Sequence, residues 1–181
     1  MDPLSVISDP VIARAVGAAM GIILIVGALG KLRDIELFRY AVENYRLLGS
    51  TGSALFARVF PVLELLAGCL LVIDATRLTG MLLGLAVMSV ATAGVVLGLR
   101  RGLDTIECGC GTGGQRISRG LVGRNAVLSL AIILGGSEGA PRHLEILDYF
   151  SVGAAVFGLL ALYACVNQLL ANQPLLKELQ S

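Results

Sequence analysis

The sequence is poor in charged, aromatic and histidine residues. Only 15% of its 181 residues are charged, it has a single histidine, and tryptophan is absent. Soluble domains are about 25% charged, so this composition argues against an ordinary soluble protein. The net charge is +1, and no run of Lys and Arg with interleaved aromatic residues occurs. We therefore exclude nucleic acid as a partner. The one histidine, His143, lies in a polar connection and is interpreted as a loop residue.

Long hydrophobic runs dominate what is present. The chain is 56% hydrophobic, with a mean hydropathy of +0.83. About twenty apolar residues suffice for a helix to cross a bilayer, so such runs predict transmembrane helices. We predict a single all-α integral membrane domain over residues 1–181, a helical bundle surrounded by the lipid bilayer. The five predicted spans are residues 11–30, 54–73, 79–99, 118–135 and 150–171. Because the residues before the first run are acidic rather than basic, we interpret that run as a retained span, not a signal peptide.

Residues 34–48 differ from the runs around them. Apolar residues recur there at helical spacing, and Glu and Arg fill the opposite face. Asp34 is suited to cap the start of such a helix, and Gly49 to end it. Between two spans, this pattern predicts an amphipathic helix that lies in the membrane interface or folds back on the bundle.

One acidic residue, Glu64, falls inside a predicted span, a few residues after Pro61. An acid within a membrane is energetically costly and is expected to face the bundle interior with a partner. The candidate partners are Lys31, Arg58 and Arg124. Both a purely structural ion pair and a proton-handling or active-site role fit this pattern.

Arg124 and Asn125 form a second polar pair, two turns inside the predicted span 118–135. They are expected to point into the bundle or to extend toward its nearer end. Ser118 is positioned to cap this helix. Together with Lys31, Asp34 and Glu64, these two residues are the candidates for a supporting pocket.

Small residues recur at a spacing of four in three places: Gly17/Gly21, Gly80/Gly84 and Gly94/Gly98. Such pairs let helix backbones approach closely, and we interpret them as packing sites within the bundle rather than a dimer contact. Cys69 and Cys165 are expected to be buried as small hydrophobic side chains.

The remaining two cysteines, Cys108 and Cys110, lie one glycine apart in a polar, glycine-rich segment, residues 102–117. Nearby arginines and the start of the next helix favour thiolates, which supports a redox-active dithiol. Two thiols alone fall short of the four ligands that structural zinc uses, although a soft metal such as Cu(I) needs fewer. The residues leave three readings open: a redox pair, a soft-metal site and neither.

The distribution of positive charge predicts an orientation. With five spans, eleven of the fourteen Lys and Arg residues fall on the side of residues 34–48, the Cys-Gly-Cys segment and the C-terminus. The positive-inside rule makes that side cytoplasmic and places the N-terminus outside.

Several short motifs, in this order, resemble the MauE-type methylamine-utilisation membrane proteins of the broader DoxX-like group. They cover about residues 11–135 and comprise Gly30-Lys31-Leu32-Arg33-Asp34, Tyr45-Arg46-Leu47-Leu48, Pro61-Val62-Leu63-Glu64-Leu65, Cys108-Gly109-Cys110-Gly111, and Ile117-Ser118 to Leu121 followed by Arg124-Asn125. The resemblance implies a four-helix DoxX-like core, here with a fifth C-terminal span. It also implies thiol–disulfide chemistry beside a thioredoxin-like partner, in the maturation of a disulfide-rich periplasmic subunit of methylamine dehydrogenase.

Three functions follow as hypotheses. The first is a membrane thiol–disulfide oxidoreductase or electron relay that uses Cys108 and Cys110 to support maturation of a partner redox protein. The second is a non-catalytic accessory or assembly subunit of a larger membrane complex, in which the Cys-Gly-Cys segment is structural or binds a metal. The third is a small-molecule or metal transporter, which the lack of an evident inverted repeat makes weaker. No cofactor or resident metal is predicted, and the residues leave room for a quinone or a soft metal.

Overall fold

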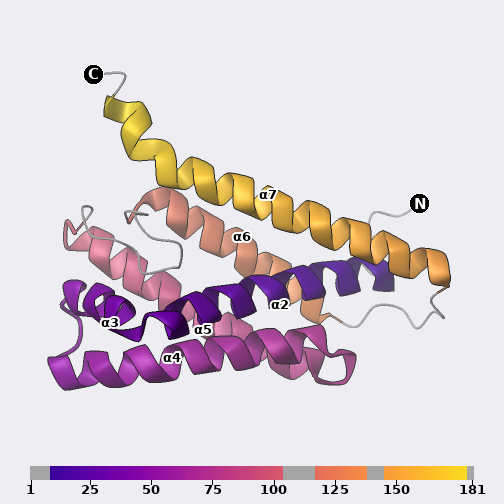
Figure 1. Cartoon of the computed structure of the whole chain (residues 1–181), viewed down its shortest axis with the longest axis horizontal. Coiled ribbons are helices and arrows are strands. Elements are labelled where there is room, and N and C mark those ends of the chain that lie inside the picture. Colours follow the sequence, from indigo (N-terminus) through magenta and orange to yellow (C-terminus); the bar gives the residue numbers. More distant parts are fainter. Residues whose placement is uncertain (1–8, 104–116, 138–144, 179–181) are drawn as a thin grey trace.

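The computed structural model describes residues 9–103, 117–137 and 145–178, with side chains described as far as residue 172. The described residues form six α-helices and one 3-10 turn and contain no strand, which confirms the all-α prediction. In chain order the elements are α2 (Pro10–Arg33), α3 (Ile35–Asn44), α4 (Ser50–Val72), η1 (Asp74–Thr76), α5 (Arg77–Arg100), α6 (Arg119–Gly136) and α7 (Ile146–Glu178). Figure 1 shows the long helices running side by side, with the short α3 at the end where α5 finishes and α6 begins.

The helix at the centre of the bundle is α2, which contacts α3, α4, α6 and α7. Its buried positions are mostly Ala and Gly, which have little or no side chain to separate neighbouring backbones. A Cβ atom built on Gly17 would lie 2.9 Å from the carbonyl oxygen of Gly135, and one built on Gly21 would lie 2.8 Å from that of Gly68. These glycines therefore pack α2 against α6 and α4, within the bundle, as small residues do between membrane helices.

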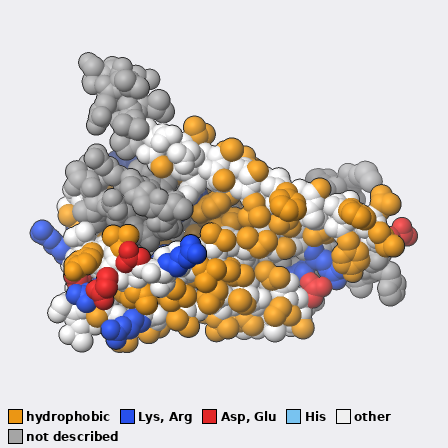
Figure 2. Space-filling view, in the orientation of Figure 1, with side chains coloured by type: hydrophobic (Ala, Val, Ile, Leu, Met, Phe, Trp, Pro, Cys, Tyr) orange, Lys and Arg blue, Asp and Glu red, His pale blue; other side chains and the backbone are white. Residues whose placement is uncertain are grey.

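Four of the described helical segments are long and apolar enough to cross a membrane: Pro10–Arg33, Ser50–Val72, Asp74–Arg100 and Ile146–Asn172. The fifth long helix, α6, has 18 residues and carries Arg124 and Asn125 in its first half. Figure 2 shows hydrophobic side chains over the middle of the visible face, with acidic and basic side chains gathered toward its two ends. This distribution is that of a multi-pass membrane protein, because lipid tails solvate only an apolar surface.

The amphipathic helix is shorter than the predicted 34–48, since α3 ends at Asn44. The chain turns at Arg46, whose φ of 52° is incompatible with a continuing α-helix. Arg101, at the end of α5, holds this turn because its guanidinium donates to the carbonyl oxygens of Tyr45 and Arg46, at 3.3 and 2.9 Å. The early end of α3 is therefore a tertiary effect.

Asp34 caps α3, since its carboxylate accepts a hydrogen bond of 2.9 Å from the backbone N–H of Leu37. Replacing a capping Asp by alanine costs about 1 kcal/mol of stability. We expect Asp34→Ala to lower the free energy of unfolding by about that amount, measured by SDS titration in mixed micelles. Asp34→Asn should be close to wild type, because asparagine caps as well as aspartate. An equal loss in both variants would show that charge, not capping, is what Asp34 contributes.

The prediction that Cys69 and Cys165 are buried is wrong. Both are free cysteines with exposed side chains, on α4 and α7 respectively. Each lies on the outer surface of a hydrophobic helix, where a membrane protein meets lipid. An apolar thiol is as well solvated by lipid tails as by a protein core, so its hydrophobicity does not determine which side it takes.

Candidate functional site

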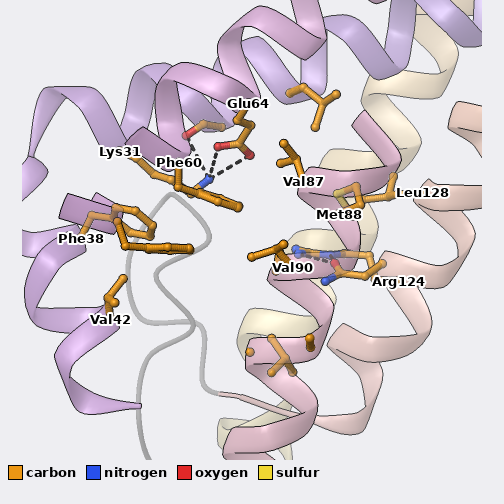
Figure 3. Close-up of a pocket in the computed structure, with 18 of the residues that line it drawn as sticks. Lys31, Phe38, Val42, Phe60, Glu64, Val87, Met88, Val90, Arg124 and Leu128 are labelled. Carbon is orange, nitrogen blue, oxygen red and sulfur yellow. Dashed lines mark hydrogen bonds and ion pairs between the residues drawn. The ribbon is translucent and has the colours of Figure 1, made fainter. Parts of the chain in front are cut away.

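A cavity of about 390 Å³ lies inside the bundle and is lined by residues of α2, α3, α4, α5, α6 and α7. Most of its wall is aliphatic or aromatic, and its charged lining residues are Lys31, Glu64 and Arg124. Figure 3 shows Lys31 and Glu64 on one side of the cavity and Arg124 on the other. A largely apolar cavity with a few convergent polar groups is the form of site that binds small molecules.

The first polar cluster is a buried ion pair between α2 and α4. The ammonium of Lys31 donates to both carboxylate oxygens of Glu64, at 2.8 and 3.0 Å, and to the carbonyl oxygen of Gly27 at 3.3 Å. The two side chains are only 7% and 10% exposed. Each charge compensates the other, because either alone would be costly in this apolar environment. Of the three candidate partners of Glu64, Lys31 is therefore the one that the fold brings to it.

An aromatic cluster borders the ion pair. The rings of Phe56 and Phe60 are stacked with centroids 4.9 Å apart, and Phe38 of α3 lies 6.2 Å from Phe60. The ammonium of Lys31 lies 5.8 Å from the centre of the Phe38 ring, within the range of a cation–π interaction. Together the three rings give the cavity a wall suited to stacking against a flat ligand.

The second polar cluster joins α5, α6 and α7. Arg124 donates to the side-chain oxygen of Asn167 at 2.6 Å and to that of Asn125 at 3.0 Å. Asn125 in turn donates to the hydroxyl of Thr92 at 3.2 Å. Asn125 is 2% exposed, so these bonds satisfy a polar side chain that has no access to solvent. The network fixes the orientation of the Arg124 guanidinium at the cavity wall.

Tyr45, which follows α3, contributes to the cavity at the end where α5 finishes. It packs with Val95, Ile117 and Leu121 in a buried cluster. Burial raises the pKa of Tyr45 to about 12, so its phenol is neutral at physiological pH. The cluster also holds Ile117, which lies two residues before the start of α6.

The predicted site residues are not all in one place. Lys31, Glu64, Arg124 and Asn125 line the cavity, whereas Asp34 caps α3 and is not part of the wall. Arg58 is exposed on α4. The predicted redox pair, Cys108 and Cys110, lies outside the described residues. Within the described ranges, no group of three or more His, Cys, Asp or Glu side chains could hold a metal ion.

Sequence reasoning missed two parts of this site. Phe56 and Phe60 precede Glu64 at successive spacings of four, which places all three on one face of a helix, and this signal was available in the sequence. Asn167 is a polar residue within the hydrophobic run of α7, a position at which contact between helices is expected. Its partner Arg124 lies 43 residues earlier, and nothing local in the sequence connects the two.

Known proteins resemble this chain over its first five described α-helices, α2 to α6. The family model described as methylamine utilisation protein MauE matches residues 9–137, which run from the cap of α2 to the end of α6. A methylamine utilization protein MauE from Paracoccus denitrificans is 32% identical over 141 residues, covering 75% of this chain and 76% of the relative. Those from Paracoccus versutus and Methylorubrum extorquens are each 36% identical, covering 75% and 71% of this chain and 74% and 70% of the relatives. No solved structure matches the chain significantly.

Proposed function

Because this chain belongs to the MauE family of methylamine utilisation proteins, we propose that it is a multi-pass membrane protein that supports maturation of a partner redox protein in that process. We further propose that Cys108 and Cys110 form its thiol–disulfide pair. The partner would be a thioredoxin-like protein or another subunit of the same membrane complex.

The observation that carries the proposal is the position of the residues that flank the cysteine segment in the chain. Leu103 hydrogen-bonds to the carbonyl oxygen of Gly98, and Ile117 packs against Tyr45 and Val95, two residues of the cavity wall. Residues 104–116 therefore connect two points at one end of the bundle, beside the cavity. In the sequence the two cysteines are followed by Arg116, Arg119 and Arg124, and positive charge near a thiol favours the thiolate.

The proposed chemistry is exchange between two dithiol/disulfide pairs. One thiolate of Cys108 or Cys110 attacks a sulfur of the partner's disulfide, forming a mixed disulfide and releasing the partner's other sulfur as a thiolate. The second thiol then displaces the partner, so two electrons and two protons pass to it and a Cys108–Cys110 disulfide forms. The same steps in reverse reduce that disulfide. A disulfide closed across one residue is strained, so it would be comparatively oxidising.

The charge distribution supports one orientation in a bacterial-type inner membrane. By the positive-inside rule, the excess of Lys and Arg on the α3 side favours a cytoplasmic location for that side, the Cys-Gly-Cys segment and the C-terminus. Labelling of Cys108 and Cys110 in intact cells with a thiol reagent that does not cross membranes tests this orientation. Labelling before the cells are permeabilised would show instead that Cys108 and Cys110 face the outside of the membrane.

The function itself is tested with single cysteine variants. Cys108→Ser and Cys110→Ser should each abolish growth on methylamine in a host lacking its own MauE, and one of them should accumulate a mixed disulfide with the partner on non-reducing gels. Cys69→Ser and Cys165→Ser are matched controls, because both thiols lie on the outer surface of the bundle. Wild-type growth of both Cys108→Ser and Cys110→Ser would contradict the redox role and leave the non-catalytic assembly subunit as the better description.

A further inference from the structure

The cavity reaches the side of the bundle as well as its core. Its lining includes the buried residues Met20 and Ile132 and also Val90 and Leu97 of α5, which are 48% and 41% exposed, so the cavity is open to the surface beside α5. Val90 lies ten residues before Arg100, so it is about 15 Å along the helix from that end. At this depth the surface of a membrane protein faces hydrocarbon. A ligand that enters here must therefore dissolve in lipid.

The polar groups of the cavity are arranged for a ligand with a polar atom at each of two opposite edges. Lys31 and Glu64 stand on one wall and Arg124 on the other, as Figure 3 shows. The carboxylate of Glu64 accepts two bonds from Lys31 and has acceptor capacity left for a ligand hydroxyl. Arg124 carries five N–H donors. Lys31, whose three N–H groups are engaged by Glu64 and Gly27, would donate to a ligand carbonyl by exchanging its 3.3 Å bond to the Gly27 carbonyl.

The aromatic wall adds a preference for a planar ligand. Phe38, Phe56 and Phe60 lie together beside the Lys31–Glu64 pair, and all three line the cavity. Aromatic faces stack on flat rings. A volume of about 390 Å³ also falls within the range of sites for small organic molecules.

We propose that this cavity binds the ring of a lipid-soluble para-quinone or its quinol. The ring lies against the phenylalanine wall, one ring oxygen meets the Lys31–Glu64 pair, and the opposite oxygen meets Arg124. Carbonyl oxygens of the quinone accept hydrogen bonds from the cations, and a hydroxyl of the quinol donates to Glu64. A lipid acyl chain would fill the same space but has no oxygen at either polar wall. This binding does not depend on the thiol chemistry proposed above.

The absence of tryptophan provides a clean assay, because any tryptophan introduced is the only one in the protein. Val90→Trp places a reporter at the cavity wall, and Leu97→Trp is a second reporter in case the first does not fold. Val127→Trp is the matched control, since Val127 is 65% exposed on α6, at a similar depth, and is not part of the wall. Purified protein in lipid nanodiscs is titrated with decylubiquinone, and quenching of tryptophan fluorescence is recorded.

We expect saturable quenching at Val90→Trp or Leu97→Trp, and only a linear, collisional decrease at Val127→Trp. Adding Gly94→Leu should weaken quinone binding about tenfold, equivalent to 1.4 kcal/mol, because it fills the cavity from a position where a Cβ meets no other atom within 4 Å. Gly123→Leu should leave quinone binding unchanged, because a Cβ at Gly123 also meets no atom within 4 Å but Gly123 does not line the cavity. Linear quenching at all reporters would overturn the proposal. So would displacement of the quinone by equimolar palmitoleate, which would identify an acyl chain as the occupant.

Discussion

Replacing Lys31 by methionine is expected to lower the free energy of unfolding by about 3–5 kcal/mol, because the carboxylate of Glu64 would then be buried without its cation. Lys31 donates both of the hydrogen bonds seen at the Glu64 oxygens, and both side chains are nearly inaccessible. Unfolding of the purified protein by SDS in mixed micelles measures the change. The control is Arg39→Met, which removes two partly exposed ion pairs on α3, with Glu36 and with Glu43, and should cost less than about 1 kcal/mol. Similar losses in the two variants would show that the buried pair contributes no more than a surface one.

The double variant Lys31→Met/Glu64→Leu separates stability from function. Replacing both members of a buried ion pair by apolar residues of similar size is often neutral or stabilising. We expect the double variant to recover most of the stability lost in Lys31→Met. Quinone binding by the double variant then reports on the role of the pair at the cavity wall. Unchanged binding in a stable double variant would show that the pair is only a structural link between α2 and α4.

Gly80→Ala is expected to destabilise the protein by about 1–3 kcal/mol, the range seen when atoms are forced into a packed core. A Cβ atom at Gly80 would lie 2.4 Å from the backbone nitrogen of Leu71, and backbone can yield only if α4 and α5 move apart. Gly94→Ala in the same helix is the control, because a Cβ there meets nothing within 4 Å. That variant should be neutral or slightly stabilising, since alanine favours a helix over glycine by about 1 kcal/mol. Unfolding measurements that rank the two variants equally would contradict the close packing of α4 on α5.

Gly80 and Gly94 differ in their surroundings, although the spacing of their motifs is the same. Gly80/Gly84 and Gly94/Gly98 have the same spacing in the same helix, and the sequence offers no basis for ranking them. Gly80 lies against the α4 backbone, whereas Gly94 faces the open cavity. A spacing of four predicts that two residues share a helix face but not what that face meets. The identity of the neighbour is a property of the bundle.

The partner of Glu64 is likewise decided partly by the sequence and partly by the packing of the helices. Helical geometry already disfavours Arg58, which lies six residues before Glu64 in α4 and so projects from a different face. The choice between Lys31 and Arg124 depends on how α2 and α6 sit against α4. In the structure, Lys31 at the end of α2 meets Glu64, while Arg124 is held by Asn125 and Asn167.

By itself, the sequence determined the class of this protein: hydrophobic runs of membrane length, an amphipathic segment after the first of them, and helix caps at Asp34 and Ser118 that the structure bears out. These features depend on length, hydropathy and hydrogen bonds to neighbouring residues, all of which are local. Only the tertiary structure decided that α3 stops at Asn44, that Cys69 and Cys165 face outward, and that two distant polar clusters share one cavity. Each of these depends on the rotation of one helix relative to another, which packing between helices sets and no single segment encodes.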